Sequence, residues 1–216
     1  MSRIILFLSV LSLLACKPEL EVHMSTDDIE SVMNDGSLEM ITFEAIIEDN
    51  YTTMDEDMRA EVKAAASVLR KYFKNSELDY DIGVKGFEIE IEGEFELTMG
   101  DGKNLNPWFF KVSKIGNNRS SETKVVLSKS LSWDDFANEL KEINFMAKPK
   151  DYLPVKIKLK NDGGELLLGG AILDGQRLSG YHREKLDGDR VTLTFKGEHW
   201  ENVPAGFLYI QSSSKE

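Results

Sequence analysis

An alternation of apolar and acidic residues between positions 87 and 99 constrains the fold of this chain more than any other feature. Apolar residues and one glycine occupy the odd positions, and glutamates occupy all but the last of the even ones: Glu88, Glu90, Glu92, Glu94 and Glu96. Because successive side chains of a strand point to opposite faces of a sheet, this pattern predicts a long strand with one buried face and one acidic, solvated face. Gly93 breaks the apolar row, which predicts a bulge or bend there.

Helical periodicity is found in three other places. A capping box at Thr53–Glu56 opens an amphipathic stretch that runs to about Asn75. Ser132 opens a second amphipathic stretch, and Ser25 opens a shorter one that ends near Met33. The sequence therefore predicts two principal helices and one short helix.

Strand character recurs along most of the remaining chain. The segments that have it are residues 17–25, 38–47, 107–115, 124–130, 155–159, 166–173, 191–195 and 207–210. Together with the helices they predict an α+β fold, in which a mainly antiparallel sheet of about seven to nine strands carries the helices. A half-closed barrel and a duplicated β-α-β unit are variants of this prediction.

The first residues of the chain have the character of a targeting signal. Arg3 precedes an apolar run over residues 4–15, which is too short to cross a bilayer core of about 30 Å as a helix and is typical of a secretory signal peptide. The end of the run, Leu13-Leu14-Ala15-Cys16, resembles the lipobox of bacterial lipoproteins. That resemblance implies cleavage before Cys16 and a diacylglyceryl thioether on its sulfur, which would tether the mature protein to a membrane. The alternative is an ordinary secretory signal that leaves a free thiol.

The resemblance also implies a location and a domain organisation. In bacterial lipoproteins a residue other than Asp after the lipidated cysteine favours the outer membrane, and Lys17 occupies that position. We expect a lipid-anchored protein on the periplasmic face of the outer membrane, or on the outer face of the plasma membrane in a Gram-positive host. The organisation is then a signal peptide at 1–15, a single α+β domain at 16–211 and a disordered tail at 212–216.

Composition narrows the possible partners. Cys16 is the one cysteine among 216 residues, so the domain contains no disulfide and depends on packing. The formal net charge of −12 repels nucleic-acid phosphates and anionic lipid headgroups. We therefore expect no nucleic-acid partner, and we expect basic partners to be favoured over acidic ones.

The sequence contains no recognisable catalytic or metal-binding motif. None of His23, His182 and His199 belongs to a pair such as H-E-x-x-H, and neither a G-x-S-x-G elbow nor a phosphate-binding loop is present. We predict a protein that is not an enzyme and holds no metal, cofactor or small-molecule ligand. A hydrolase with a non-sequential site is the alternative, which requires a cleft that joins His182 or His199 with a carboxylate and a hydroxyl.

Three adjacent aromatic residues are one candidate for an interaction surface. The rings of Trp108, Phe109 and Phe110 point to both sides of an expected strand, so the side away from the core needs cover. A partner, a ligand or a second layer of the same domain can supply it.

The glutamate row is the other candidate. It can bind a cation or a basic partner, stay solvated, or pair with the alternating Lys156, Lys158 and Lys160 if both strands belong to one sheet. The function we expect is a non-enzymatic, membrane-anchored scaffold or interaction module of the bacterial envelope, bound to an unidentified envelope protein. The alternative is a carrier or chaperone for a hydrophobic ligand, which a deep apolar cavity would favour.

Overall fold

The computed structural model describes most of the expected domain. The described residues are 19–103, 106–115, 122–143, 155–162, 165–169, 172–173, 176–177, 182–184, 190–195 and 205–212. The predicted signal peptide, Cys16 and the tail after residue 212 lie outside these ranges. The statements below concern the described part of the chain.

The described residues form three helices, each where the sequence predicted one: α1 (Thr26–Asp35), α2 (Glu56–Tyr72) and α3 (Trp133–Ile143). In α1 the Ser25 hydroxyl accepts from the Asp28 amide at 3.1 Å, and the Asp28 carboxylate accepts from the Ser25 amide at 2.7 Å. This reciprocal capping box fixes the start of the helix. None of the described helices combines the length and the apolar character that crossing a membrane requires.

The start of α2 differs from the prediction. Its N-cap is Asp55, whose carboxylate accepts from the Met58 amide at 2.8 Å. The predicted cap, Thr53, is still part of a strand, because the preceding sheet pairing continues up to that residue. Both residues are good caps, and the length of the strand decides between them.

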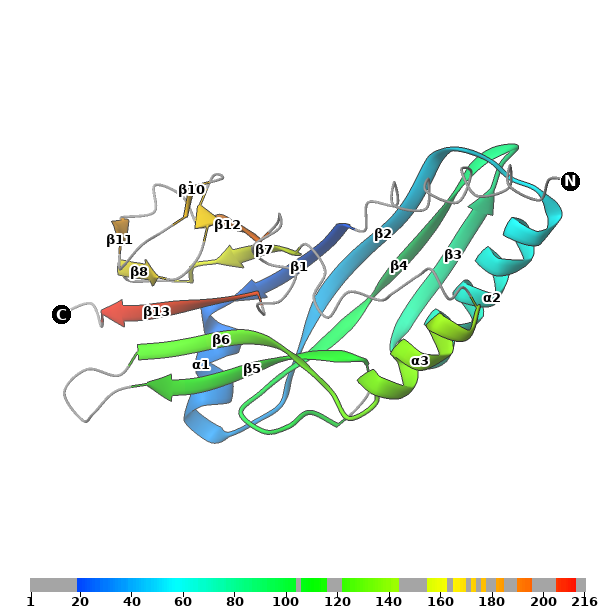
Figure 1. The fold of residues 1–216 in the computed structure, drawn as a ribbon. Coiled ribbons are helices and arrows are strands. Elements are labelled where there is room, and N and C mark those ends of the chain that lie inside the picture. The colour runs from blue at the N-terminus through cyan, green and yellow to red at the C-terminus, as the bar shows by residue number, and fades with distance from the viewer. Residues whose placement is uncertain are drawn as a thin grey trace, which may run out of the picture.

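The strands of the described segments form one 13-stranded sheet. They are β1 (Glu19–Ser25), β2 (Glu39–Thr53), β3 (Ser76–Ile82), β4 (Lys85–Thr98), β5 (Trp108–Ile115), β6 (Glu122–Lys129), β7 (Val155–Lys160), β8 (Glu165–Gly169), β9 (Ile172–Leu173), β10 (Gln176–Arg177), β11 (His182–Glu184), β12 (Arg190–Phe195) and β13 (Gly206–Ser212). Their order is β10-β9-β12-β7-β1-β2-β4-β5-β6-β13-β8-β11, and β3 pairs with β4 outside this path (Figure 1).

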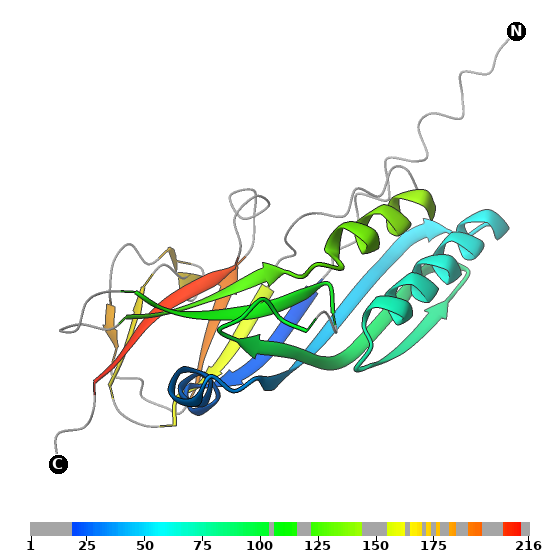
Figure 2. The same cartoon turned by 90° about the horizontal axis from the view of Figure 1, so that it is seen from below.

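The α+β class is confirmed, and the finer description of the sheet is corrected. The sheet is mixed and not the mainly antiparallel one expected, because β1 pairs with β7 and β4 pairs with β5 in parallel. The chain after residue 160 adds several short strands to it. The sheet curls into a half-barrel, which was one of the predicted variants (Figure 2).

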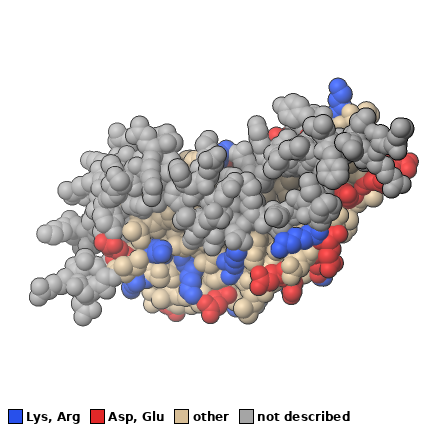
Figure 3. All heavy atoms as spheres, viewed as in Figure 1, with Lys and Arg blue, Asp and Glu red and all other residues tan. Residues whose placement is uncertain are grey.

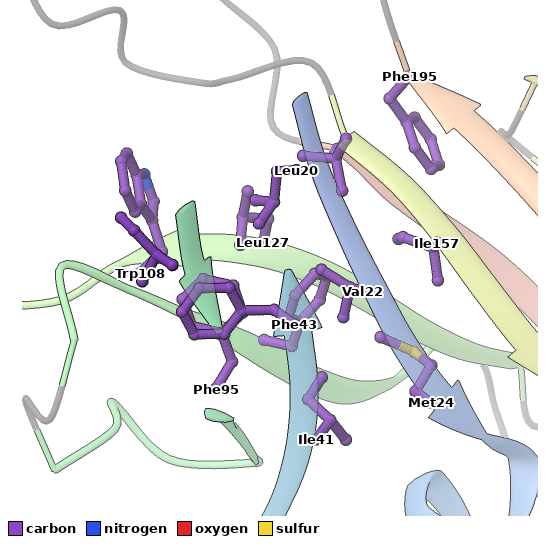
Figure 4. Close-up of a cluster of buried hydrophobic side chains, with 14 of the residues drawn as sticks. Leu20, Val22, Met24, Ile41, Phe43, Phe95, Trp108, Leu127, Ile157 and Phe195 are labelled. Atoms are coloured by element: carbon purple, nitrogen blue, oxygen red, sulfur yellow. The ribbon is translucent and has the colours of Figure 1, made fainter. Parts of the chain in front are cut away.

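The concave side of the curled sheet holds the core (Figure 4). Side chains from seven strands converge there, and those labelled in the figure are Leu20, Val22, Met24, Ile41, Phe43, Phe95, Trp108, Leu127, Ile157 and Phe195. The rings of Phe43 and Phe95 stack with their centroids 4.0 Å apart. At the end of α2, Phe73 packs against both of these rings, and it also contacts Phe136 of α3. Aromatic packing therefore joins the two helices to the sheet.

Gly93 in the middle of β4 permits a close approach of two chain segments. A Cβ atom there would lie 2.7 Å from the Asn75 carbonyl oxygen and 2.7 Å from the Ser76 Cβ. The register with β2 passes from Glu92 to Glu94 without a shift, so there is no β-bulge at Gly93. The glycine is needed because the turn before β3 crosses β4 at this point.

The paired strands β2, β4 and β3 extend beyond the beginning of β1 as an arm, and α2 and α3 lie along one side of it (Figures 1 and 2). Glu19, the first residue of β1, pairs with Ile46, whereas β2 continues to Thr53, which pairs with Lys85. Because the register shift between Asp49 and Thr53 adds residues to β2 alone, the length of the arm is measured along β4. From Glu90, the partner of Ile46, to Lys85 it continues for about 17 Å, at roughly 3.3 Å per residue.

Candidate functional site

The glutamate row of β4 becomes part of a larger acidic surface when its neighbours are added. Register pairing places Glu92 between Glu44 of β2 and Glu77 of β3. One row further along, Glu90 lies opposite Asp79, and Glu88 lies opposite Asp81. We call this surface the acidic face and define it by its exposed carboxylates: Glu44, Glu77, Asp79, Asp81, Glu88, Glu90 and Glu92.

Cross-strand neighbours on the acidic face carry the same charge. Like charges directly opposite each other destabilise a sheet, so this arrangement lowers the stability of the arm at low ionic strength. Among the described residues, the registers of β2, β3 and β4 place no lysine or arginine opposite the acidic face. The side shown in Figure 3 differs, because acidic and basic side chains alternate along its lower part.

The lysine strand does not pair with the glutamate strand. Lys156, Lys158 and Lys160 lie on β7, and β1 and β2 separate β7 from β4 in the sheet. Lys158 instead forms an ion pair with Glu21 of β1, and Lys160 forms one with Asp162. The two charged rows therefore share one side of the same sheet but occupy different parts of it.

A second polar cluster lies between these two regions. On β1, Glu21 and His23 alternate with buried residues, and the Glu21 Oε1 atom lies 3.0 Å from His23 Nε2. Glu44 of β2 is the direct register partner of Glu21. The ligand atoms of Glu21, His23 and Glu44 all lie within 4.8 Å of one another, a spacing that a divalent metal ion can bridge.

The ammonium group of Lys158 opposes metal binding at this cluster. It already forms an ion pair with Glu21, and a cation placed there would have to displace it or tolerate its charge. Glu21, His23 and Lys158 are therefore better described as an ion-pair network, with the Glu44 carboxylate beside it. Sequence reasoning missed this network. The signal was present in the polar positions of β1, but the partner strands were needed to find it.

Glu94 and Glu96 do not belong to the exposed acidic face, which corrects the predicted row. Glu94 is half-buried, and Glu96 is buried with 1% of its surface exposed. Both carboxylate oxygens of Glu96 accept from the Lys103 amide at 2.8 Å. Gly102 belongs to the same loop and has a φ of 69°, in the left-handed region that favours glycine. Through the Lys103 amide, Glu96 holds this tight turn in place.

The aromatic group at the start of β5 is covered from within the domain. Trp108, Phe109 and Phe110 are 4%, 3% and 0% exposed, so they do not form an exposed surface in this structure. Trp108 packs against Trp133, with ring centroids 4.7 Å apart, and Phe110 packs against Phe95. Phe109 points to the other side, where the loop that Glu96 holds lies against its ring.

Helices α2 and α3 are joined by a polar contact at the edge of the core. The Tyr72 hydroxyl donates to the Glu139 carboxylate at 2.7 Å, and the Lys71 ammonium donates to the same oxygen at 2.5 Å. The hydrogen bonds from Lys71 and Tyr72 lower the pKa of Glu139, and the bond to Glu139 raises the pKa of Tyr72. These shifts belong to a structural contact between two helices.

The remaining predicted positions give less information. Of the histidines, His23 belongs to the ion-pair network, the backbone of His182 pairs with Leu168, and His199 lies outside the described residues. The proposed lipidation site, Cys16, also lies outside them. Comparisons with protein-family models, with curated proteins and with solved structures gave no significant match.

Proposed function

We propose that this chain is a bacterial lipoprotein that works as a non-enzymatic interaction module of the cell envelope. The lipobox ending at Cys16 supports the anchor, and Lys17 supports the outer membrane as the location in a host that has one. The acidic face carries the interaction part of the proposal. Its like charges stand directly opposite one another on three adjacent strands, which costs stability in the free protein.

A partner with a basic surface fits this face best. Opposite charges on the partner would relieve the repulsion between the paired carboxylates and would steer the encounter at low salt. The acidic side chains are carried by paired strands, so their spacing is set by the backbone. Such an array suits an extended basic surface better than a single cation.

The test is chemical crosslinking of the lipoprotein in its native membrane, followed by identification of the crosslinked protein. We expect the triple variant Glu88→Gln, Glu90→Gln, Glu92→Gln to lose the crosslinked partner that the unaltered protein captures. The control Asp134→Asn, Asp135→Asn, Glu142→Gln removes the same number of exposed charges from α3 and should keep the partner. Equal capture by both variants would contradict the proposed surface.

A carrier of hydrophobic ligands is the second candidate, and the packing of the core does not favour it. Where the structure describes the concave side of the sheet, stacked and tilted rings from the strands and helices pack together. A carrier would have to open this packing to admit a ligand. Recovery of a stoichiometric lipid with the purified protein, in addition to its covalent anchor, would reverse the order of the two candidates.

A further inference from the structure

The position of the anchor along the sheet restricts how the body can sit on a membrane. Cys16 precedes Glu19, the first residue of β1, by three residues, which span at most about 11 Å in an extended chain. The lipid-bearing end of the mature chain is therefore held close to the start of β1. The inference drawn here rests on the proposed lipidation of Cys16.

The start of β1 lies partway along the length of the body, and strands extend past it in both directions. Toward one end, β2 and β4 continue to the pair Thr53–Lys85, a distance of about 17 Å along β4. Toward the other end, β1 itself runs about 20 Å to Ser25, where α1 begins. Each overhang exceeds the reach of the three-residue connection.

An upright orientation would therefore push one end of the body into the bilayer. With either end down, that end would lie about 6–9 Å below the anchor, which is as deep as the whole headgroup layer of roughly 5–8 Å per leaflet and brings it to the hydrocarbon boundary. The end of the arm carries Asp55, Asp81 and Lys85, which are all exposed, and charged groups are costly in hydrocarbon. The strands must then run nearly parallel to the membrane surface.

The distribution of charge selects the side that faces the lipid. On the outer side of the sheet, β7 and β12 carry Lys156, Lys158, Lys160 and Arg190, next to the anchored strand β1. Glu21 and Asp162 offset part of this charge. On the other flank of β1, β2 leads to the acidic face. Anionic headgroups attract the basic side chains of β7 and β12 and repel the acidic face.

We infer that the mature lipoprotein lies with its strands along the bilayer surface, with β7 and β12 toward the headgroups and the acidic face turned away. The net charge alone predicts repulsion from anionic lipid, and this orientation keeps the carboxylates that cause it at a distance. It also leaves the acidic face accessible to a partner.

The experiment uses the lipidated protein in vesicles of phosphatidylcholine and phosphatidylglycerol. Because a lipidated Cys16 has no free thiol, one added cysteine gives a unique site for a fluorophore, whose quenching by a headgroup-labelled lipid reports its distance from the surface. Four exposed positions suffice: Val84→Cys at the end of the arm, Asn34→Cys in the last turn of α1, Thr192→Cys on β12 and Glu90→Cys on the acidic face.

We expect similar quenching at Val84→Cys and Asn34→Cys, and a several-fold larger loss of fluorescence at Thr192→Cys than at Glu90→Cys. Strong quenching at only one end, or stronger quenching at Glu90→Cys, would overturn the inferred orientation while the anchor stands. The intact mass of the same preparations separates the two proposals. A chain without lipid on Cys16 would overturn the anchor and the orientation together.

Discussion

Glu92 of β4 lies directly opposite Glu44 of β2, and both carboxylates are exposed on the outer side of the sheet. On the other flank of β4, Glu77 of β3 pairs with the same Glu92. Three acidic residues therefore stand in line across three strands. This line connects the folding of the arm to its proposed role, because repulsion that lowers stability in the free protein becomes attraction when a basic partner binds.

Neutralising the acidic face should stabilise the protein. In Glu88→Gln, Glu90→Gln, Glu92→Gln, each removed like-charge pair is worth roughly 0.2–1 kcal/mol at low salt. We expect a higher midpoint of urea unfolding for this variant than for the unaltered protein at low ionic strength, and a smaller difference at high ionic strength. A lower midpoint at both ionic strengths would mean that the carboxylates stabilise the arm.

Removing the ring of Phe95 should unfold much of the core. Phe95 is fully buried and stacks on Phe43, so Phe95→Ala should cost about 3–5 kcal/mol of unfolding free energy. Tyr80→Ala, at a position that is 41% exposed, is the matched control and should cost far less. Chemical denaturation of both variants checks this, and equal losses would place Phe95 outside the core.

The close approach at Gly93 should make that glycine hard to replace. In Gly93→Ala, the added methyl group would meet the Asn75 carbonyl oxygen and the Ser76 Cβ, and the backbone would have to move at a cost of about 1–3 kcal/mol. At Gly100 the nearest atom would be 3.7 Å from an added Cβ, so Gly100→Ala should be nearly neutral. Thermal unfolding of the two variants should separate them, and a neutral Gly93→Ala would show that the turn before β3 does not press on β4.

The Glu139 contact should give the stability a defined pH dependence. Its folded pKa is lowered from 4.5, first by the hydrogen bond from Lys71 and then by that from Tyr72. The contribution of Glu139 is therefore fully present above about pH 4.5 and is lost as the pH falls through the lower folded pKa. We expect Glu139→Gln to be less stable than the unaltered protein at neutral pH, and the difference to shrink on acidification. If the difference in unfolding free energy between the two proteins stayed constant as the pH fell to about 3, this assignment would be contradicted.

Local patterns predicted the elements well, because each depends on side chains close together in sequence. The alternation from Phe87 to Met99 corresponds to β4, and the Ser25 signal corresponds to the capping box of α1. Thr53 was wrong as a cap because tertiary pairing extends β2 through it. The role of Gly93 was also hidden, since it depends on a turn that approaches β4 from outside the strand.

The order of the strands could not be read from the sequence, and the candidate sites depend on it. The lysine row and the glutamate row could both be recognised in the sequence. Only the pairings of β1 with β2 and β7 show that Lys158 forms an ion pair with Glu21. The pairing of β2 with β4 brings Glu44 beside Glu92. For Trp108, Phe109 and Phe110, the sequence indicated that both sides of the strand need cover, and the structure supplies that cover from α3 and from the loop after β4.

The intact mass of the protein purified from its native membrane tests the central claim most directly. The account predicts a chain that begins at Cys16 and carries the added mass of a diacylglyceryl group on that residue. A polypeptide that still begins at Met1, with an unmodified cysteine, would contradict it.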